Sequence, residues 1–321
     1  MPIPAEFSLI ARHFAPLAGP GALGLLDDAA LLTPPANREL VLAADAMVAG
    51  VHFLPDDPPE TLGRKLLRVN LSDLAAMGAA PLGYLMTLAL PRGTPDAWLA
   101  AFSAGLAEDQ REFGLSVLGG DTVSIPGPVT LSLTILGHVA PGQALRRAGA
   151  RPGDEVWVSG SIGDGALGLM ALRGAVADAG GFLASRYRLP RPRLALGQAL
   201  AGLARAAMDV SDGLVQDLGH LCRAGGCGAV LRAADVPLSP PAAALVAAGA
   251  VALPKLLSGG DDYELLFAAP PGAAPEIFAR AAACGVAVSR IGHFVPGEAV
   301  VTVLDEAGAE LPPGPGGWSH F

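Results

Sequence analysis

The chain has 321 residues, which exceeds a typical single domain and makes two domains the better expectation. Its formal net charge of −9 disfavours non-specific binding to nucleic acid, so no nucleic-acid partner is predicted. Hydrophobic residues make up 51% of the chain, but much of that fraction is alanine, and the longest apolar stretch, residues 240–254, is too short to cross a bilayer. No membrane association is therefore predicted.

The first half of the chain predicts strands and helices in alternation. Residues 39–44 form an apolar run that predicts a buried strand ending at Asp45. Apolar residues recur at helical spacing over residues 59–77, and this pattern places Asp73 on the inward face of a helix. Strands are also predicted at residues 83–90, 116–118 and 129–139, and a helix at residues 95–113. The alternation indicates a mixed α/β or α+β domain.

A change of composition marks the middle of the chain. Residues 141–154 are polar and rich in arginine, glycine and proline, which predicts a boundary between an N-terminal domain, residues 1–140, and a C-terminal domain, residues 141–321. A second cycle of elements follows. Strands are predicted at residues 155–159, 207–210, 265–268, 286–295 and 300–304, and helices at residues 166–175, 192–206 and 213–224.

Short acidic motifs lie where apolar runs break at a glycine, serine or asparagine. Their aspartates are Asp27, Asp28, Asp45, Asp73, Asp121, Asp209 and Asp212. Each could be a turn or a helix cap, but seven independent caps are the less economical account. Carboxylates gathered in one cleft would repel one another by about 4 kcal/mol per pair at about 4 Å, so a shared site needs cations. Oxygen-only ligands favour Mg²⁺.

Other patterns were weighed against these motifs. Residues 163–168 match G-x-G-x-x-G after a strand, but no acidic strand end follows about twenty residues later, so a tight turn is favoured over a dinucleotide site. The arginine-rich residues 186–193 are interpreted as a solvated loop rather than a phosphate patch. A P-loop is absent, which excludes that kind of nucleotide site. A nucleophile elbow and cysteine nucleophile signatures are also absent, so acyl transfer lacks support, and phosphoryl transfer fits better because it needs charge neutralisation by a metal rather than a protein nucleophile. Three cysteines without metal spacing predict a cytoplasmic protein.

The order of these motifs resembles the thiamine-monophosphate kinase family. The most specific runs are N-L-S-D-L-A-A-M-G-A at residues 70–79 and S-G-G-D-D-Y-E-L at residues 258–265. The resemblance implies an aminoimidazole-ribonucleotide-synthetase-like fold, with an N-terminal mixed-sheet domain that pairs in a homodimer and a C-terminal α+β domain. It also implies the reaction, in which ATP as co-substrate phosphorylates thiamine phosphate to thiamine diphosphate with several Mg²⁺ ions.

The resemblance also implies roles for individual residues. Mg²⁺ ligands are implied at Asp28, Ala43, Ala44, Asp45, Asp73, Asp121, Asp209 and Asp212. ATP contacts are implied at Gly120, Asp121, Arg147 and Ser211, and thiamine phosphate contacts at His52, Asp261 and Trp318. Among these residues, Asp45, Asp73 and Asp121 are the implied catalytic set.

Two departures from the family pattern concern the site. Ala43 and Ala44 stand where hydroxyl residues are common, so Mg²⁺ contacts there would come from backbone carbonyls, and Asp261 stands where glutamate is frequent. The alternatives are another ATP-dependent ligase or synthetase of the superfamily, or a non-catalytic sensor of thiamine phosphates or nucleotides. Residues 1–30 contain no cysteine, and the chain does not end in one, which disfavours two of the superfamily alternatives.

Overall fold

The computed structural model describes residues 5–312 and 317–318. The chain forms two compact units. Unit 1 consists of Met1–Leu74 and Ala79–Gly142, and unit 2 consists of Ala75–Gly78 and Gln143–Phe321. No helix in the described part of the chain is both long and apolar enough to span a membrane.

Unit 1 contains a four-stranded mixed sheet in the order β1-β4-β2-β3. Its strands are β1 Glu39–Val48, β2 Ala80–Pro91, β3 Val117–Ile125 and β4 Thr130–Val139. Only the β2 and β3 pair is parallel; the other pairs are antiparallel. Before β1, the chain forms α1 Ala5–Leu9 and three short helical turns, Ile10–Phe14, Ala15–Leu17 and Pro20–Leu25.

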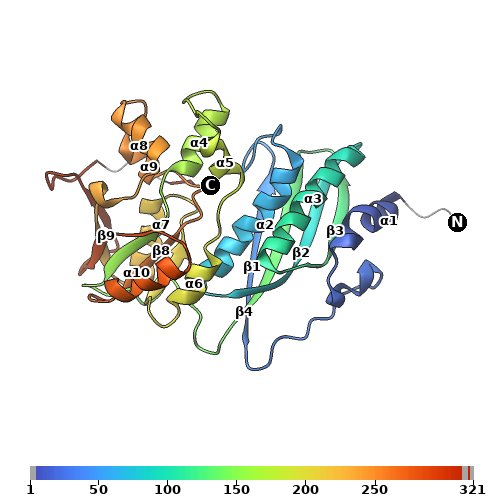
Figure 1. Cartoon of the computed structure of the whole chain (residues 1–321), viewed down its shortest axis with the longest axis horizontal. Helices are drawn as coiled ribbons and strands as arrows, with labels where there is room; N and C mark the ends of the chain where they lie inside the picture. Colours follow the sequence, from blue (N-terminus) through green and yellow to red (C-terminus); the bar gives the residue numbers. More distant parts are fainter. Residues whose placement is uncertain (1–4, 313–316, 319–321) are drawn as a thin grey trace. The chain divides into compact units, whose positions relative to one another are not determined.

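Two helices, α2 Pro59–Ala76 and α3 Asp96–Phe113, lie side by side over one face of this sheet (Figure 1). Glycines allow their close approach, because a Cβ atom on Gly63 would lie 2.4 Å from a carbonyl oxygen of α3, and one on Gly105 would lie 2.0 Å from a carbonyl oxygen of α2. Arg68 of α2 donates from Nε and Nη2 to the two carboxylate oxygens of Asp109 in α3, at 2.6 and 2.9 Å. On the opposite face, residues of the helical turns Ile10–Phe14 and Pro20–Leu25 line a cavity together with outward-facing residues of β2 and β4.

Unit 2 is built on a six-stranded mixed sheet in the order β10-β7-β9-β5-β8-β6. Its strands are β5 Glu155–Ser159, β6 Ala206–Asp209, β7 Gly228–Arg232, β8 Leu265–Ala269, β9 Val288–Val295 and β10 Val301–Leu304. Its helices are α4 Asp164–Leu172, α5 Phe182–Arg188, α6 Leu194–Leu200, α7 Leu214–Gly225, α8 Pro240–Ala247, α9 Leu253–Leu257 and α10 Ala274–Ala283, with a 3-10 turn at Ala233–Asp235.

Each face of the larger sheet has its own hydrophobic core. Alternate residues of β5 show the division, because Val156 and Val158 pack with α7 on one face and Trp157 packs with α6 and α10 on the other. The sheet is therefore apolar on both faces, which explains why all five residues of β8, Leu265–Ala269, are buried. A third cluster joins α4, α5, α8 and α9.

The predicted elements are present, with changed boundaries. The strand expected at residues 39–44 continues to Val48, so Asp45 lies within β1 rather than at its end. The helix expected at residues 192–206 is the shorter α6, Leu194–Leu200. Strand β7 and helices α5, α8, α9 and α10 were not predicted. Alanine-rich segments such as α8 lack a polar face, and so they give little periodicity to recognise.

Candidate active site

In unit 1, Asn70 of α2 attaches the backbone of Asp45 in β1 to the helix that carries Asp73. The buried Asn70 side chain accepts the backbone N–H of Asp45 at 3.2 Å and donates to the carbonyl of Leu66 at 2.8 Å. Asp73 follows one helical turn after Asn70 and is half-buried. Asp45 pairs across the sheet with Leu133, a fully buried residue, which places its side chain on the helix-covered face. Asp45 and Asp73 therefore flank the β1–α2 contact.

The backbone carbonyls of the two predicted alanine ligands, Ala43 and Ala44, point in opposite directions. β1 is an edge strand of the sheet, with β4 on its other side. Because Asp45 donates its N–H to Asn70, its backbone polar groups point away from β4, toward that edge. Residues two apart in a strand point their backbone groups the same way, so Ala43 also presents its carbonyl at this edge. Ala44 instead faces β4, where it pairs with Thr134. Of the two alanines, only Ala43 has the geometry for an outward carbonyl ligand.

His52 lies in the tight turn after β1. Its Nδ1 accepts the backbone N–H of Val48 at 3.0 Å, so the neutral ring carries its proton on Nε2. The backbone carbonyl of His52 accepts a hydrogen bond from the buried Lys65 of α2 at 3.3 Å. The turn is therefore attached to the same helix that carries Asp73.

Asp28, Gly120 and Asp121 lie elsewhere in unit 1, around a cavity of about 650 Å³ on the face of the sheet away from α2 and α3. Asp121 pairs with Thr87, whereas Asp45 belongs to the row of Leu133, Met86 and Gly120, so the side chains of Asp45 and Asp121 point to opposite faces. Gly120 is required at its position, because a Cβ atom there would lie 1.8 Å from the Met86 carbonyl oxygen.

In unit 2, the turn between β6 and α7 holds the predicted residues Asp209, Ser211 and Asp212. Its conformation is fixed by Asp217, a residue that the sequence reasoning missed. One oxygen of Asp217 accepts three successive backbone N–H groups, from Ser211, Asp212 and Gly213, each at 3.1 Å. The sequence did contain a signal for this role, because Asp217 is an acid in the first turn of the predicted helix, where a carboxylate interacts with the N-terminal N–H groups.

The carboxylates around this turn lie close enough to influence one another. Burial, followed by the negative charges of Asp209 and Asp212, raises the pKa of Asp217 to about 7, although the backbone hydrogen bonds oppose the rise. Ligand atoms of Asp212, Asp217 and His220 lie within 4.8 Å of one another. A cation would relieve this repulsion, and the carboxylate oxygens suit Mg²⁺, whereas an imidazole nitrogen suits softer metals.

Two further predicted residues are attached to the same turn. The N–H of Asp261 donates to the carbonyl of Ser211 at 2.9 Å, and the N–H of Trp318 donates to the carbonyl of Asp212 at 3.0 Å. Gln216 of α7 also donates to the carbonyl of Trp318 at 2.9 Å. Unit 2 therefore gathers Ser211, Asp212, Asp261 and Trp318, while Arg147 is exposed on the segment before β5.

The G-x-G-x-x-G segment at the start of α4 binds a carboxylate of the protein itself. Asp262 accepts the backbone N–H groups of Gly163 at 2.7 Å and Gly165 at 3.0 Å, and it is almost completely buried. Burial raises the pKa of Asp262 to about 8, although these two hydrogen bonds oppose the rise. The donors that would hold a pyrophosphate are thus occupied, which supports the tight-turn interpretation.

The interpretation of residues 186–193 as a solvated loop was wrong. Arg186 is buried, and both Arg186 and Arg193 donate to the fully buried carboxylate of Glu264, with shortest distances of 2.9 and 2.6 Å. Burial lowers the pKa of Arg193, but its hydrogen bonds to Glu264 and the charge of that carboxylate outweigh burial, so the net shift is upward. A composition rich in arginine and proline gave no sign of a buried partner 71 residues away.

Comparisons with known proteins identify the family. Residues 26–139 match the AIR synthase related protein, N-terminal domain, and residues 151–305 match the AIR synthase related protein, C-terminal domain. The thiamine-monophosphate kinase of Caulobacter vibrioides is 46% identical over 325 residues, covering 99% of this chain and 91% of that protein. The chain belongs to the thiamine-monophosphate kinase family. The family member from Escherichia coli K12 is 45% identical over 272 residues, covering 83% of this chain and 82% of that protein.

Solved structures of this family have the same fold. The thiamine-monophosphate kinase of Stenotrophomonas maltophilia K279a superposes with a TM-score of 0.80 at 39% identity, covering 87% of this chain and 89% of that chain. The structure of AaThiL complexed with AMPPCP and TMP gives a TM-score of 0.79 at 30% identity, covering 94% and 97%. The predicted superfamily fold is confirmed. The hydrogenase maturation protein HypE of E. coli, at 21% identity and a TM-score of 0.80, shares that fold alone.

Proposed function

We propose that the protein transfers the terminal phosphoryl group of ATP to thiamine phosphate, giving thiamine diphosphate and ADP. The observation that carries this proposal is the 46% identity to the C. vibrioides thiamine-monophosphate kinase over 99% of the chain. The relative complexed with AMPPCP and TMP, whose chain is matched over 97% of its length, supports the same pair of substrates.

The chemistry suits a site made of carboxylates. A phosphate monoester has a second pKa of about 6, so the acceptor is already mostly dianionic at neutral pH and needs no general base. The barrier comes from bringing two polyanions together in line, and positioning with charge neutralisation lowers it. Mg²⁺ supplies that neutralisation when it is bound. The protein's part is to hold the two phosphate groups and the cations in register.

The predicted residues have these roles in the proposal. Mg²⁺ would be held by Asp28, Asp45, Asp73, Asp121, Asp209 and Asp212 and by the backbone carbonyl of Ala43, whereas Ala44 is left out because its backbone faces β4. The proposed catalytic set is Asp45 and Asp73, on the side of the sheet that α2 covers, with Asp121 on the other face. ATP would be bound by Gly120, Asp121, Arg147 and Ser211, and thiamine phosphate by His52, Asp261 and Trp318. Residues 1–140 would form the ATP-binding, metal-binding and dimerisation domain, and residues 141–321 the C-terminal domain.

We also propose that the protein is a cytoplasmic homodimer. The face of the unit 1 sheet away from α2 and α3 exposes apolar side chains on three of its four strands, which is the kind of surface that a second copy covers. Those side chains are Leu40, Leu42, Leu85 and Val123. Three free cysteines, of which Cys222 and Cys227 are buried, suit a reducing compartment. Light scattering should give a dimer mass that falls to the monomer mass in Leu42→Glu; a monomeric wild type would contradict this part.

The deciding experiment is ADP release by the purified protein with ATP, MgCl₂ and thiamine phosphate, against a reaction without acceptor. Acceptor-dependent ADP with thiamine diphosphate formed is expected, and chelation of Mg²⁺ with EDTA should abolish it. Asp45→Asn and Asp121→Asn should each abolish turnover in a folded protein, whereas Asp235→Asn, on an exposed turn, should not. Tight ATP binding without turnover would instead support a sensor, and turnover only with another acceptor would support a different superfamily synthetase.

A further inference from the structure

The segment Gly259 to Glu264 alternates between two environments. Asp262 and Glu264 are 1% and 0% exposed, whereas Asp261 and Tyr263 are half-buried. Asp261 and Tyr263 also have left-handed backbones, with φ of +68° and +52°. Residues other than glycine rarely adopt this conformation, so the surrounding structure must hold both of them in it. The two buried carboxylates alternate with the two strained residues.

Asp262 attaches the segment to the start of α4. Its two oxygens separately accept the N–H groups of Gly163 and Gly165, so both oxygens are used and the side chain cannot rotate freely. Gly165 approaches so closely that a Cβ atom there would lie 2.4 Å from the carbonyl oxygen of Asp261. The helix terminus therefore contacts the backbone of Asp261 as well as the carboxylate beside it.

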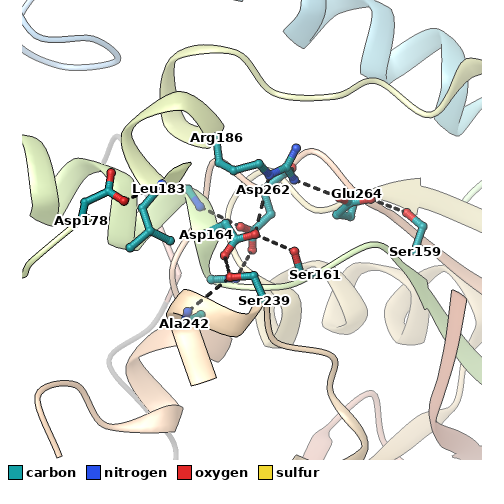
Figure 2. A network of polar contacts seen from close by, with 12 residues as sticks. Ser159, Ser161, Asp164, Asp178, Leu183, Arg186, Ser239, Ala242, Asp262 and Glu264 are labelled. Carbon is teal, nitrogen blue, oxygen red and sulfur yellow. Dashed lines mark hydrogen bonds and ion pairs between the residues drawn. The ribbon is translucent and has the colours of Figure 1, made fainter. Parts of the chain in front are cut away.

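Glu264 attaches the other end of the segment to α5 and β5. Its carboxylate accepts hydrogen bonds from Arg186 at 2.9 Å and from the hydroxyl of Ser159 at 2.6 Å (Figure 2). It also accepts one from Arg193 at 2.6 Å. Arg186 also donates to the backbone carbonyl of Asp262 at 3.4 Å. Buried hydrogen bonds thus lie on both sides of Tyr263, and the guanidinium of Arg186 joins the two sides.

We propose that Asp262 and Glu264 are positioning residues for the acceptor. They hold Asp261 in its left-handed conformation beside Ser211, so that its carboxylate is already ordered when thiamine phosphate arrives. This inference rests on the proposed function, in which Asp261 contacts the acceptor. A site that is ordered beforehand loses less conformational entropy on binding, so weakening an anchor should reduce acceptor affinity more than ATP affinity.

The test compares Asp262→Asn with Ser239→Ala. An asparagine amide has only one acceptor oxygen, so one of the two glycine N–H groups would face an NH₂ group. Ser239 belongs to the same buried network and donates to Asp164 at 2.5 Å, but no hydrogen bond recorded for it reaches residues 259–264. Asp262→Asn should raise KM for thiamine phosphate at least tenfold with KM for ATP changed less than threefold, and Ser239→Ala should change neither by more than threefold.

Calorimetry of thiamine phosphate binding to the wild type and both variants should show the same loss of acceptor affinity. Equal effects of the two variants, or an Asp262→Asn protein with the acceptor KM of the wild type, would overturn the proposal. Arg193→Lys is a milder second variant, because it keeps the charge but loses the two-point contact with Glu264, and its acceptor KM should also rise more than its ATP KM. Turnover of thiamine phosphate by the wild type is measured first, so a failure of the proposed function would appear before any variant is compared.

Discussion

The substitution Glu264→Gln should destabilise unit 2 strongly. The carboxylate is fully buried and accepts hydrogen bonds from Arg186 and Arg193, whose side chains are only 6% and 16% exposed. Removing its charge leaves the Arg193 guanidinium without its Glu264 counter-ion, leaves Arg186 with its longer ion pair to Asp164 at 3.6 Å, and turns an NH₂ group toward donors. Breaking a buried ion pair in this way costs about 3–5 kcal/mol. At about 2–4 °C per kcal/mol for a domain of this size, Tm should fall by roughly 6–20 °C.

Thermal unfolding followed by circular dichroism measures this fall, and Glu276→Gln is the matched control. Glu276 also pairs with an arginine, Arg280, but the two side chains are 56% and 36% exposed, so the control should lose only about 0–1 kcal/mol. The double variant Glu264→Gln with Arg193→Gln should recover part of the loss, because one uncompensated charge is then removed. A Glu264→Gln protein within about 1 kcal/mol of the wild type, with no coupling to Arg193, would refute the reasoning.

Three other predictions concern unit 2. Burial raises the pKa of Asp262 to about 8, so the folded state binds more protons than the unfolded chain between about pH 4 and about pH 8. The wild type should therefore lose stability relative to Asp262→Asn as pH rises through that window, and a pH-independent Tm difference would contradict this. Asp217→Ala leaves three backbone N–H groups without their acceptor, so the free energy of unfolding in urea should fall by about 2–3 kcal/mol and the rate of ADP release at least tenfold. An unchanged urea midpoint would exclude the role assigned to that carboxylate. Gly260→Ala would place a Cβ atom 2.3 Å from the Ser211 carbonyl oxygen and should cost about 1–3 kcal/mol, whereas wild-type stability would show that the turn can yield.

Local pattern was sufficient for most elements because it depends on near neighbours in the sequence. The apolar spacing of residues 59–77 predicted α2 to within one residue at its end, and residues 155–159 were predicted with both ends correct. Where a segment has no contrast between faces, as in the alanine-rich α8, periodicity carries little information and the element was missed. Strand β1 was cut short for a similar reason, because Asp45 is a polar residue inside an edge strand that tolerates it.

The sequence by itself determined the family, because ordered runs such as residues 70–79 and 258–265 are specific, and it singled out the acidic residues as a group. Only the tertiary structure decided how they are arranged. It placed Asp45 and Asp121 on opposite faces of one sheet, and it separated Asp262 from Asp261 by turning one carboxylate inward. Burial depends on partners far away in the chain, such as Gly163 for Asp262, and those partners meet only when the sheet and its helices are assembled.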